Sequence, residues 1–422
     1  FTPLQSPPYQ GGEAGGDGWK IRFNRLKGGA IDQFYHNKIE SGTKNLISEE
    51  SALFEIKYSD DSVLNHAADF ELIESSATRV RVKAVSQVNN DPVEIIYTVY
   101  LSGKINVETN LNLQNTNLNS VSGVFNLQLC GVGADLVSAL CAPTADSEGK
   151  LGQIAVENGP IVGMAPSETD KIGEASADID EGAILFGTSG SGWGKGEIAN
   201  VHWLLDLNAG DFLTDIATDF RNPDTLNFTI GQDENGYHQE DGAYWMRASG
   251  NKVGFIMYGA EVNRYNPVFR IANWNIPALA KVYAEVAGTE IKQDVDYIIS
   301  FKDNKPEDAV LIFQYLGKVS QDLIFYIDPT CTSTAAGNWS STSIWDCGVV
   351  PDGDDTAVVQ HAVVINQDVT ILGITINSGG KLSFDTTART VTVNESGGSA
   401  LITVGAASGG SGELECRAPS AG

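Results

Sequence analysis

The feature that most constrains the fold is a long alternation of apolar and polar residues between positions 78 and 112. The segments TRVRVKAVSQV (78–88) and VEIIYTVYLSGKINVETNLN (93–112) place an apolar side chain at nearly every second position. Successive side chains of a β-strand point to opposite faces of the sheet, so this period predicts strands with one buried face. The segments ALFEIKYSD (52–60) and DFELIES (69–75) continue the pattern. Short turns between such runs predict antiparallel neighbours in wide sheets.

Helical signals are few. AGDFLTDIATDF (209–220) predicts a short helix capped by Asp211, and KPEDAVLIFQYLGKVSQDL (305–323) predicts a second helix from Pro306 onward. Strands and helices do not alternate along the chain, which disfavours a doubly wound sheet. The strand-rich region covers roughly 310 residues, whereas one immunoglobulin-like sandwich takes about 100. We therefore expect an all-β protein with a large antiparallel β-sandwich.

The first hairpin of this region carries a family resemblance. KGGAIDQFYHNKIESGTKNLI (27–47) has a strand, a Gly-Gly turn and a strand with the pair Asn45-Leu46. It resembles the first hairpin of the galactose-mutarotase-like supersandwich domains of sugar epimerases and several polysaccharide lyases. The resemblance covers some 30 residues and implies a carbohydrate-binding face, with no particular reaction attached.

A second module begins near Pro329. Its segments NWSSTSIW (338–345), VPDGDD (350–355), HAVVINQD (361–368) and ITINSGGKLSF (374–384) are similar to the first rungs of G8-type parallel β-helix modules. Apolar triplets also recur near Val364, Ile374, Phe384, Val393 and Ile402, separated by Gly, Asn and Asp turns. Such a repeat is how successive strands of a β-solenoid stack their inward side chains.

These patterns predict four parts: an extended arm (1–18), a large β-sandwich (19–328), a short β-solenoid (329–405) and a flexible tail (406–422). No cap is evident after Val404, and an uncapped solenoid end is an open edge that invites pairing. We consider three explanations: truncation of a longer protein, coverage of the end by the first domain, and self-association through the uncapped end.

Charge and cysteines bear on location and partners. The chain has 54 acidic and 27 basic side chains, a net charge of −27 that repels nucleic acids and anionic membranes. No run of about 18 apolar residues appears, so we expect no membrane insertion. The chain starts at Phe1 without a methionine, which we interpret as the start of a processed, exported chain.

Two cysteine pairs have the spacing of disulfides. Cys331 and Cys347 bracket a short loop, and Cys130 and Cys141 flank a Gly-rich turn, with two buried free thiols as the alternative for the second pair. Cys416 is left over. This usage favours a secreted or cell-surface protein in an oxidising environment.

The richest collection of proton-handling and sugar-binding side chains lies between residues 233 and 274. Cleavage of a uronate polysaccharide by β-elimination needs a group that neutralises the carboxylate, a base, and an acid for the leaving oxygen. Candidate catalytic residues are His238, Tyr244, Arg264 and Tyr265, and candidate substrate-binding residues are Tyr237, Trp245, Arg247, Arg270 and Trp274. The same residues also fit ordinary strand patterning, with aromatic side chains in the core and arginines at the rim.

Other chemistries remain open for this stretch. Hydrolysis would need two carboxylates across the glycosidic bond, for which Glu240, Asp241 and Glu261 are candidates. The supersandwich epimerases pair a histidine with a glutamate, a role that resemblance extends to His202, His238 and Glu240.

Metal binding has weaker signals. The five histidines are dispersed, which predicts no histidine metal site. Acidic turns such as Asp233-Glu234 with Glu240-Asp241, and Asp352 with Asp354-Asp355, would suit calcium, although solvated turn carboxylates are the simpler interpretation.

Taken together, the sequence predicts a secreted carbohydrate-active protein whose partner is an extracellular polysaccharide. Lyase-type cleavage is favoured over hydrolysis. The alternative is a non-enzymatic extracellular structural protein, such as an adhesin, surface-layer or filament subunit, that assembles through its β-rich domains.

Overall fold

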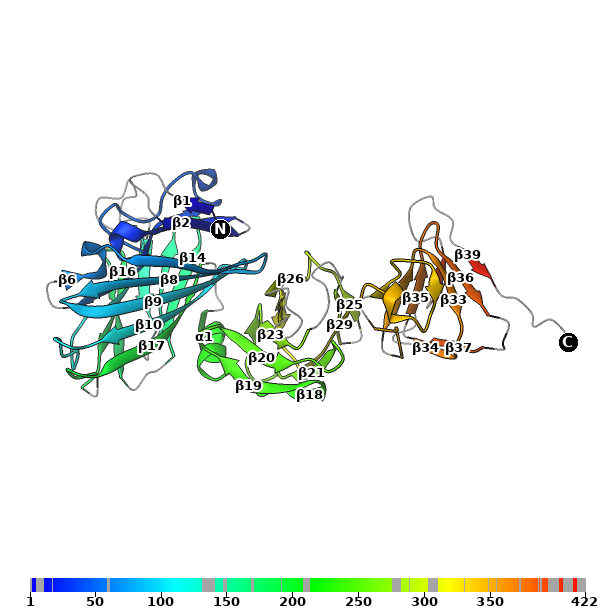
Figure 1. Cartoon of the computed structure of the whole chain (residues 1–422). Coiled ribbons are helices and arrows are strands. Elements are labelled where there is room, and N and C mark those ends of the chain that lie inside the picture. The colour runs from blue at the N-terminus through cyan, green and yellow to red at the C-terminus, as the bar shows by residue number, and fades with distance from the viewer. Residues whose placement is uncertain are drawn as a thin grey trace. The chain divides into compact units, whose positions relative to one another are not determined.

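The computed structural model is nearly all β-structure, with 6% helix, and it confirms the predicted class (Figure 1). It describes residues 2–4, 11–16, 18–58, 61–130, 141–146, 150–167, 171–190, 192–207, 213–274, 282–287, 289–302, 310–329, 331–347, 349–353, 355–371, 373–385, 387, 389–393, 402–404 and 413–415. The chain divides into two compact units. The first comprises 1–224, 237–243 and 262–266, and the second comprises 225–236, 244–261 and 267–422.

The first unit is a large antiparallel β-sandwich. Its main sheet has eight strands in the order β12-β13-β14-β17-β10-β9-β8-β7. These are β7 (Asp69–Ser75), β8 (Arg79–Val88), β9 (Asp91–Tyr100), β10 (Lys104–Asn112), β12 (Cys141–Ala145), β13 (Gly152–Val156), β14 (Ile161–Pro166) and β17 (Ile198–Asp206). Opposite it lie β15 (Ile172–Asp178), β16 (Ala183–Thr188), β11 (Phe125–Gln128), β5 (Phe54–Tyr58) and β6 (Asp61–Ser62), in that order.

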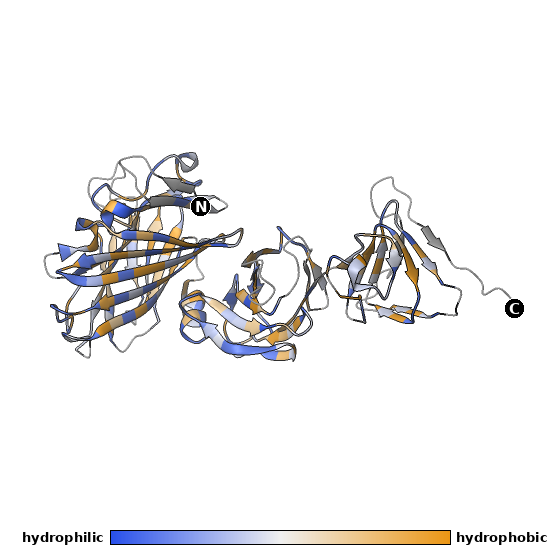
Figure 2. Ribbon diagram, in the orientation of Figure 1, coloured by the Kyte–Doolittle hydropathy of each residue, from blue (hydrophilic) through white to orange (hydrophobic). Residues whose placement is uncertain are grey.

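The core of this sandwich forms because each strand buries one face, and Figure 2 shows the resulting alternation of hydrophobic and hydrophilic residues along the strands. Trp203 of β17 is fully buried, and the rings of Phe54, Phe125 and Phe186 from the opposite sheet lie 4.5–5.9 Å from it, measured between ring centroids. Aromatic contacts in this range join the two sheets.

A third sheet contains the predicted first hairpin. It has the order β1 (Thr2–Leu4), β2 (Gly11–Gly16), β3 (Trp19–Asn24) and β4 (Ala30–His36). Gly28 and Gly29 of the β3–β4 turn have φ of 66° and 74°, and a Cβ on Gly29 would meet the Ala84 Cβ at 2.2 Å. Only glycine fits this turn, so the predicted Gly-Gly turn is confirmed.

One of the two predicted helices exists. Helix α1 (Leu213–Arg221) confirms the first, although Asp211 lies outside the described residues. The prediction of a helix after Pro306 is wrong, because this region forms β27 (Val310–Tyr315) and β28 (Lys318–Val319). Val310–Gln314 are all buried, so both faces of β27 are covered and the strand lacks the alternation that would have identified it. Among the described residues, no helix is long and apolar enough to cross a membrane.

The second unit begins with a smaller sandwich of two five-stranded sheets. One contains β18 (Asn227–Ile230), β21 (Val253–Met257), β29 (Leu323–Pro329), β24 (Val282–Val286) and β25 (Thr289–Ile291), in that order. The other contains β19 (Gln232–His238), β20 (Ala243–Arg247), β23 (Val268–Ala272), β27 and β26 (Tyr297–Lys302). Phe255 of the first sheet meets Phe269 of the second with ring centroids 4.8 Å apart. The predicted sandwich range 19–328 thus includes strands of both units, and the boundary between the units falls inside β19.

A parallel β-solenoid follows in the same unit, which confirms the solenoid part of the predicted fold class. Its strands form parallel ladders. One ladder contains β30 (Cys331–Thr332), β32 (Thr356–Val359), β35 (Gly373–Ile376) and β38 (Ile402–Val404). Another contains β31 (Gly337–Asn338), β33 (Ala362–Ile365), β36 (Lys381–Phe384) and β39 (Glu413–Glu415), and a shorter one pairs β34 (Val369–Ile371) with β37 (Val391–Val393). From β32 onward, each strand stacks on the strand three further along the chain. Successive apolar triplets therefore lie on different faces of the coil.

The two ends of the chain also contribute strands. Residues 1–18, predicted as an arm, include β1 and β2, and residues 406–422, predicted as a tail, include β39. Both predicted disulfides are present, Cys130–Cys141 and Cys331–Cys347, with Cα atoms 6.1 and 5.0 Å apart. Cys416 lies outside the described residues.

A charge cluster lies where the small sandwich meets the solenoid, with Lys252, Asp328 and Asp355 buried and Asp352 exposed. Lys252 Nζ is 2.9 Å from both Asp352 Oδ1 and Asp355 Oδ1. Asp328, at the end of β29, is fully buried beside them. Burial and the neighbouring Asp355 raise the pKa of Asp328 well above its usual value, although Lys252 opposes this effect. Asp328 therefore retains its proton at a pH where an exposed aspartate is ionised.

We expect the Cys331→Ser, Cys347→Ser double variant to lose about 3 kcal/mol of stability, because the disulfide joins residues 16 positions apart and so closes a loop in the unfolded chain. Hydrogen exchange of the solenoid strands would measure the loss. The matched control is Cys130→Ser, Cys141→Ser, which removes a disulfide of the first unit. Equal exchange in the solenoid of all three proteins would contradict the prediction.

We expect the stability of the second unit to fall as pH rises above about 4. The unfolded chain releases the Asp328 proton near that pH, whereas the folded protein keeps it until the pH reaches the raised pKa. The free energy of unfolding therefore falls by ~1.4 kcal/mol for each pH unit between these two values. Lys252 has a raised pKa, so its contribution is constant until near pH 10. Calorimetry between about pH 4 and 9 should show that the free energy of unfolding changes less with pH in Asp328→Asn than in the wild type. Parallel profiles for the two proteins would show that Asp328 is not the source of the pH dependence.

Candidate functional site

The outer face of the eight-stranded sheet carries many polar side chains. The alternation that buries Val82, Tyr97 and Val107 turns their sequence neighbours to the opposite face. Four adjacent strands contribute polar side chains there: Arg79, Arg81 and Lys83 from β8; Glu94, Thr98 and Tyr100 from β9; Lys104, Asn106, Glu108 and Asn110 from β10; and Asn200, His202 and Asp206 from β17.

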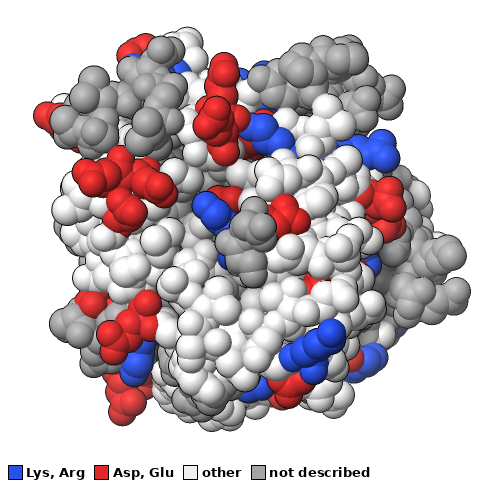
Figure 3. Space-filling model, turned by 90° about the vertical axis from the view of Figure 1, so that its left-hand side faces the viewer, with Lys and Arg blue, Asp and Glu red and all other residues white. Residues whose placement is uncertain are grey.

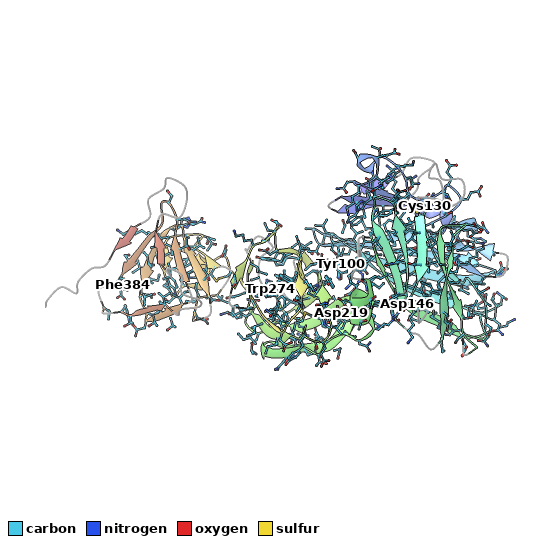
Figure 4. All side chains as sticks on the ribbon, turned by 180° about the vertical axis from the view of Figure 1, so that it is seen from behind. Tyr100, Cys130, Asp146, Asp219, Trp274 and Phe384 are labelled. Carbon is cyan, nitrogen blue, oxygen red and sulfur yellow. A yellow bond between two sulfur atoms is a disulfide. The ribbon has the colours of Figure 1, made fainter. Side chains whose placement is uncertain are left out.

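One end of this face is covered by the segment Tyr237–Ala243, which belongs to the same unit. Thr98 Oγ1 donates a hydrogen bond to the carbonyl of Glu240 over 3.3 Å, and Asn106 Nδ2 donates to that of Gln239 over 3.2 Å. Tyr100, labelled in Figure 4, donates its hydroxyl to the Asp241 carbonyl. These three hydrogen bonds hold the segment through its backbone carbonyls.

Buried ion pairs hold the same segment. Asp241 is 2% exposed, and its carboxylate lies 3.6 Å from Arg79 Nη1 and 3.4 Å from Arg81 Nη1. Arg79 also pairs with Glu74 at 2.9 Å. Lys104 Nζ lies 3.4 Å from the Tyr237 hydroxyl. Burial lowers the pKa of Lys104, and the charges of Asp219 and Asp206 oppose that effect.

Helix α1 covers a neighbouring part of the face. Its residues Leu213 and Phe220 pack in one cluster with Ala165 of β14 and Leu204 of β17, and Tyr237 and Tyr265 pack against this cluster. Arg264, in β22 (Arg264–Tyr265), is buried and donates from Nη1 to Asp219 Oδ1 of the helix over 2.6 Å. The carboxylate of Asp219 balances the charge of Arg264 at this position.

The other end of the polar face is open and carries a hydrogen-bonded network. Glu108 Oε1 accepts from Asn110 Nδ2 at 3.0 Å and from Asn200 Nδ2 at 3.4 Å. His202 is the cross-strand partner of Glu108 in the β10–β17 register. Glu108 is two residues along β10 from Asn106, or roughly 7 Å, so the network begins where the covering segment ends.

The covering segment brings a histidine and a glutamate together. His238 Nδ1 lies 2.8 Å from Glu240 Oε1, and both side chains are partly exposed. A carboxylate on one ring nitrogen fixes the orientation and tautomer of an imidazole. Glu240 is therefore an orienting partner for His238.

The nine predicted catalytic and binding residues are divided between the units. Tyr237, His238, Arg264 and Tyr265 belong to the first unit, and Tyr244, Trp245, Arg247, Arg270 and Trp274 belong to the second. Tyr244 and Trp274 are 1% and 0% exposed and are core residues of the second unit. Figure 4 labels Trp274. Trp245 and Arg270 are partners in the parallel β20–β23 register, and Arg247 is exposed.

The carboxylates considered for hydrolysis are also separated. Glu240 contacts His238, Asp241 is buried against two arginines, and Glu261 is exposed in the second unit. Glu108, Asn110 and Asn200 were not among the residues predicted from the sequence. The alternation in KINVETNLN (104–112) places Glu108 and Asn110 on one face, but the pairing of β10 with β17 is needed to bring Asn200 to them.

The described residues contain no group of three or more His, Cys, Asp and Glu side chains arranged for a metal ion. The acidic turns considered for calcium make other contacts. Asp352 and Asp355 pair with Lys252, and Glu234 pairs with Arg247, whereas Asp354 lies outside the described residues.

Comparisons with known proteins give little guidance. No protein-family model matches the chain, and no curated protein matches it either. Among solved structures, the crystal structure of 4-alpha-glucanotransferase from Thermococcus litoralis, a carbohydrate-active enzyme, is similar with a TM-score of 0.30 and 10% identity. The match covers 47% of this chain and 38% of that one, so this chain spans well under two thirds of it. A likeness this weak carries no argument about fold or activity.

We expect Arg79→Met to destabilise the first unit by about 3–5 kcal/mol, because it leaves Glu74 buried without this cation and leaves Asp241 with Arg81 alone. It should also raise hydrogen exchange in the segment Tyr237–Ala243. Arg22→Met is a matched control, since Arg22 pairs with Glu13 at 2.8 Å but is partly exposed, and it should cost less than about 1 kcal/mol. Equal effects of the two variants in urea unfolding would contradict the assigned role of Arg79.

Proposed function

We propose that this protein is an extracellular carbohydrate-active protein that binds a polysaccharide on the open polar face of its eight-stranded sheet. The observation that carries the proposal is the network of Glu108, Asn110 and Asn200 beside His202, adjoined by the His238–Glu240 segment. Carboxylate and amide groups offer the acceptors and donors that sugar hydroxyls require. The two disulfides support an oxidising, extracellular setting.

The finer proposal is cleavage of a uronate polysaccharide by β-elimination. His238, oriented by Glu240 through Nδ1, removes the proton from C5 of the uronate through Nε2, which is buried and must be uncovered for this step. The electron pair of the C5–H bond forms the C4–C5 double bond, and the C4–O bond breaks with its electrons leaving on oxygen. Tyr237, whose hydroxyl lies close to Lys104, donates a proton to that oxygen. Asn200 and His202 hydrogen-bond the carboxylate and so make the C5 proton more acidic.

Several predicted residues take no part in this proposal. Tyr244 and Trp274 are core residues of the second unit, and Arg264 is buried against Asp219. Hydrolysis is the less favoured reaction, because it needs a pair of carboxylates flanking one bond, and on this face Glu240 is engaged with His238.

The test is a panel of uronate polysaccharides monitored for the ultraviolet absorbance of the unsaturated product. We expect turnover by the wild-type protein and a fall in kcat of about 100-fold or more for His238→Ala, the usual contribution of a general base. His66→Ala is the matched control, because His66 also contacts a carboxylate, Asp61, at 2.8 Å in the first unit but lies in a connection after β6. Its rate should equal that of the wild type.

Each other outcome contradicts part of the proposal. New reducing ends without ultraviolet absorbance would show that the reaction is hydrolysis and not elimination. Binding without turnover, abolished by Glu108→Gln, would leave a binding protein and exclude the enzyme. If the protein shows no binding and no turnover, and sedimentation shows concentration-dependent assembly, the proposal would be overturned in favour of a structural protein.

A further inference from the structure

The sheet of the small sandwich that contains β18, β21 and β29 exposes an uncharged patch on its outer face. Asn227 of β18 is the register partner of Ile256 of β21, and Ile256 is the register partner of Ile324 of β29. Tyr258 belongs to the same patch, because its hydroxyl accepts a hydrogen bond from Asn227 Nδ2 over 3.4 Å. We call Asn227, Ile256, Tyr258 and Ile324 the outer patch.

The core of the small sandwich fixes which side chains face outward. Phe228, Phe255 and Phe325 are neighbours across the same three strands and pack on the inner face. The ring centroids of Phe228 and Phe255 are 5.8 Å apart, and those of Phe255 and Phe325 are 5.3 Å apart. Because successive side chains of a strand alternate between faces, this packing turns Asn227, Ile256 and Ile324 toward solvent.

The outer patch exposes apolar surface beside the edge of a sheet. Ile324 and Tyr258 are 54% and 38% exposed. In the described part of the chain, β18 is the edge strand of its sheet. The face visible in Figure 3 offers a contrast, because described acidic and basic side chains are scattered over it among uncharged residues. Exposed apolar side chains next to an edge strand favour association with another chain unless something covers them.

The edge strand carries an acceptor motif for a covalent glycan. Asn227, Phe228 and Thr229 form the sequence Asn-Phe-Thr, which is the motif for N-linked glycosylation. Asn227 and Thr229 are both exposed. A Cβ on Gly254, two residues before Ile256, would lie 2.7 Å from Thr229 Oγ1. The two polar residues of the motif therefore lie on the face of the outer patch, whereas Phe228 packs inward.

We propose that Asn227 is an N-glycosylation site and that the first sugars of its glycan cover the outer patch. A glycosylated asparagine keeps one hydrogen on Nδ2, so the hydrogen bond to Tyr258 is compatible with the modification. The first sugar starts from this nitrogen and can lay its apolar C–H groups on the Tyr258 ring and on Ile324. Removing this apolar surface from water is favourable, and the bulk of the glycan shields the edge strand.

The modification is a group transfer from an activated sugar. Nδ2 of Asn227 forms a bond to the anomeric carbon of a lipid-linked oligosaccharide pyrophosphate. The bond between that carbon and the pyrophosphate oxygen breaks, its electrons leave on oxygen, and the amide gives up one proton. A transferase on the export route supplies the donor, so the proposal rests on the extracellular setting of the proposed function. It depends neither on polysaccharide binding nor on elimination.

A second sequence motif provides an internal comparison. Asn338, Trp339 and Ser340 also form an acceptor motif, and Asn338 is exposed. The described residues of the solenoid expose no large apolar side chain to the extent of Ile324. A glycan on Asn338 would therefore cover no comparable patch. The third motif begins at Asn394, which lies outside the described residues.

The test is secretion of the full chain from a eukaryotic host that carries out N-glycosylation, followed by mass spectrometry of its peptides. We expect a glycan on Asn227. Thr229→Ala should abolish it, because the variant removes the motif, whereas Thr229→Ser keeps the motif and should keep the glycan. These two variants are a matched pair, since both retain Asn227 and the side chains of the outer patch.

The covering role has its own measurement. Thr229→Ala should bind severalfold more of a fluorescent dye that reports exposed apolar surface than Thr229→Ser does. It should also self-associate at lower concentration in sedimentation. Adding Ile324→Thr to Thr229→Ala should reverse both effects. Asn338→Gln is the control, because it removes the other acceptor away from the outer patch, and it should change neither.

The outcomes are separable from those of the proposed function. An unmodified Asn227 in the secreted chain would overturn the proposal, with or without a glycan on Asn338. If that unmodified chain also forms a dimer that Ile324→Thr dissociates, the outer patch is an interface between two copies. A glycan on Asn227 with equal dye binding by Thr229→Ala and Thr229→Ser would overturn the covering role. A glycan on Asn227 in a protein without elimination activity would support this proposal and reject the lyase.

Discussion

The one-sided burial of the eight-stranded sheet is the constraint on which the first unit depends. Val82, Tyr97, Val107 and Trp203 come from four adjacent strands and share the buried face. A slip of one residue in any strand would exchange its buried and exposed side chains, so hydrophobic burial fixes the register. The same register fixes the opposite face, where Glu108 therefore lies beside His202 and Asn200. The polar network is thus positioned by the core rather than by its own hydrogen bonds.

The covering segment shows how a charged sheet face can be partly buried. Desolvating Arg79, Lys104 and Asp241 is costly, and the cost is offset only where each group finds a partner. Arg79 and Arg81 meet Asp241, and Lys104 meets the Tyr237 hydroxyl and the Gly242 carbonyl. These contacts cover one end of the face and bring His238 and Glu240 to the edge of the open part. Stability and the proposed chemistry therefore depend on the same segment.

Scarce basic side chains are used for different purposes in the second unit. Lys252 is buried between the small sandwich and the solenoid, where Asp328, Asp352 and Asp355 outnumber it and burial keeps Asp328 protonated. Arg247 and Arg270 instead lie on the outer face of the small sandwich, where Glu234 contacts both. In the cluster around Lys252, the proton that Asp328 retains reduces the excess of negative charge.

The sequence by itself determined the all-β class, the Gly28-Gly29 hairpin, helix α1, both disulfides and the solenoid, because each has a local signature. It failed for residues 310–315, since a strand buried on both faces has no alternation. The stretch 233–274 looked like one site because its residues are adjacent in sequence, but its strands contribute to two units. Only strand pairing brings Glu108, Asn200 and His202 together, across about 90 positions of sequence. Periodicity reports which face a residue occupies, and only tertiary structure decides which faces meet.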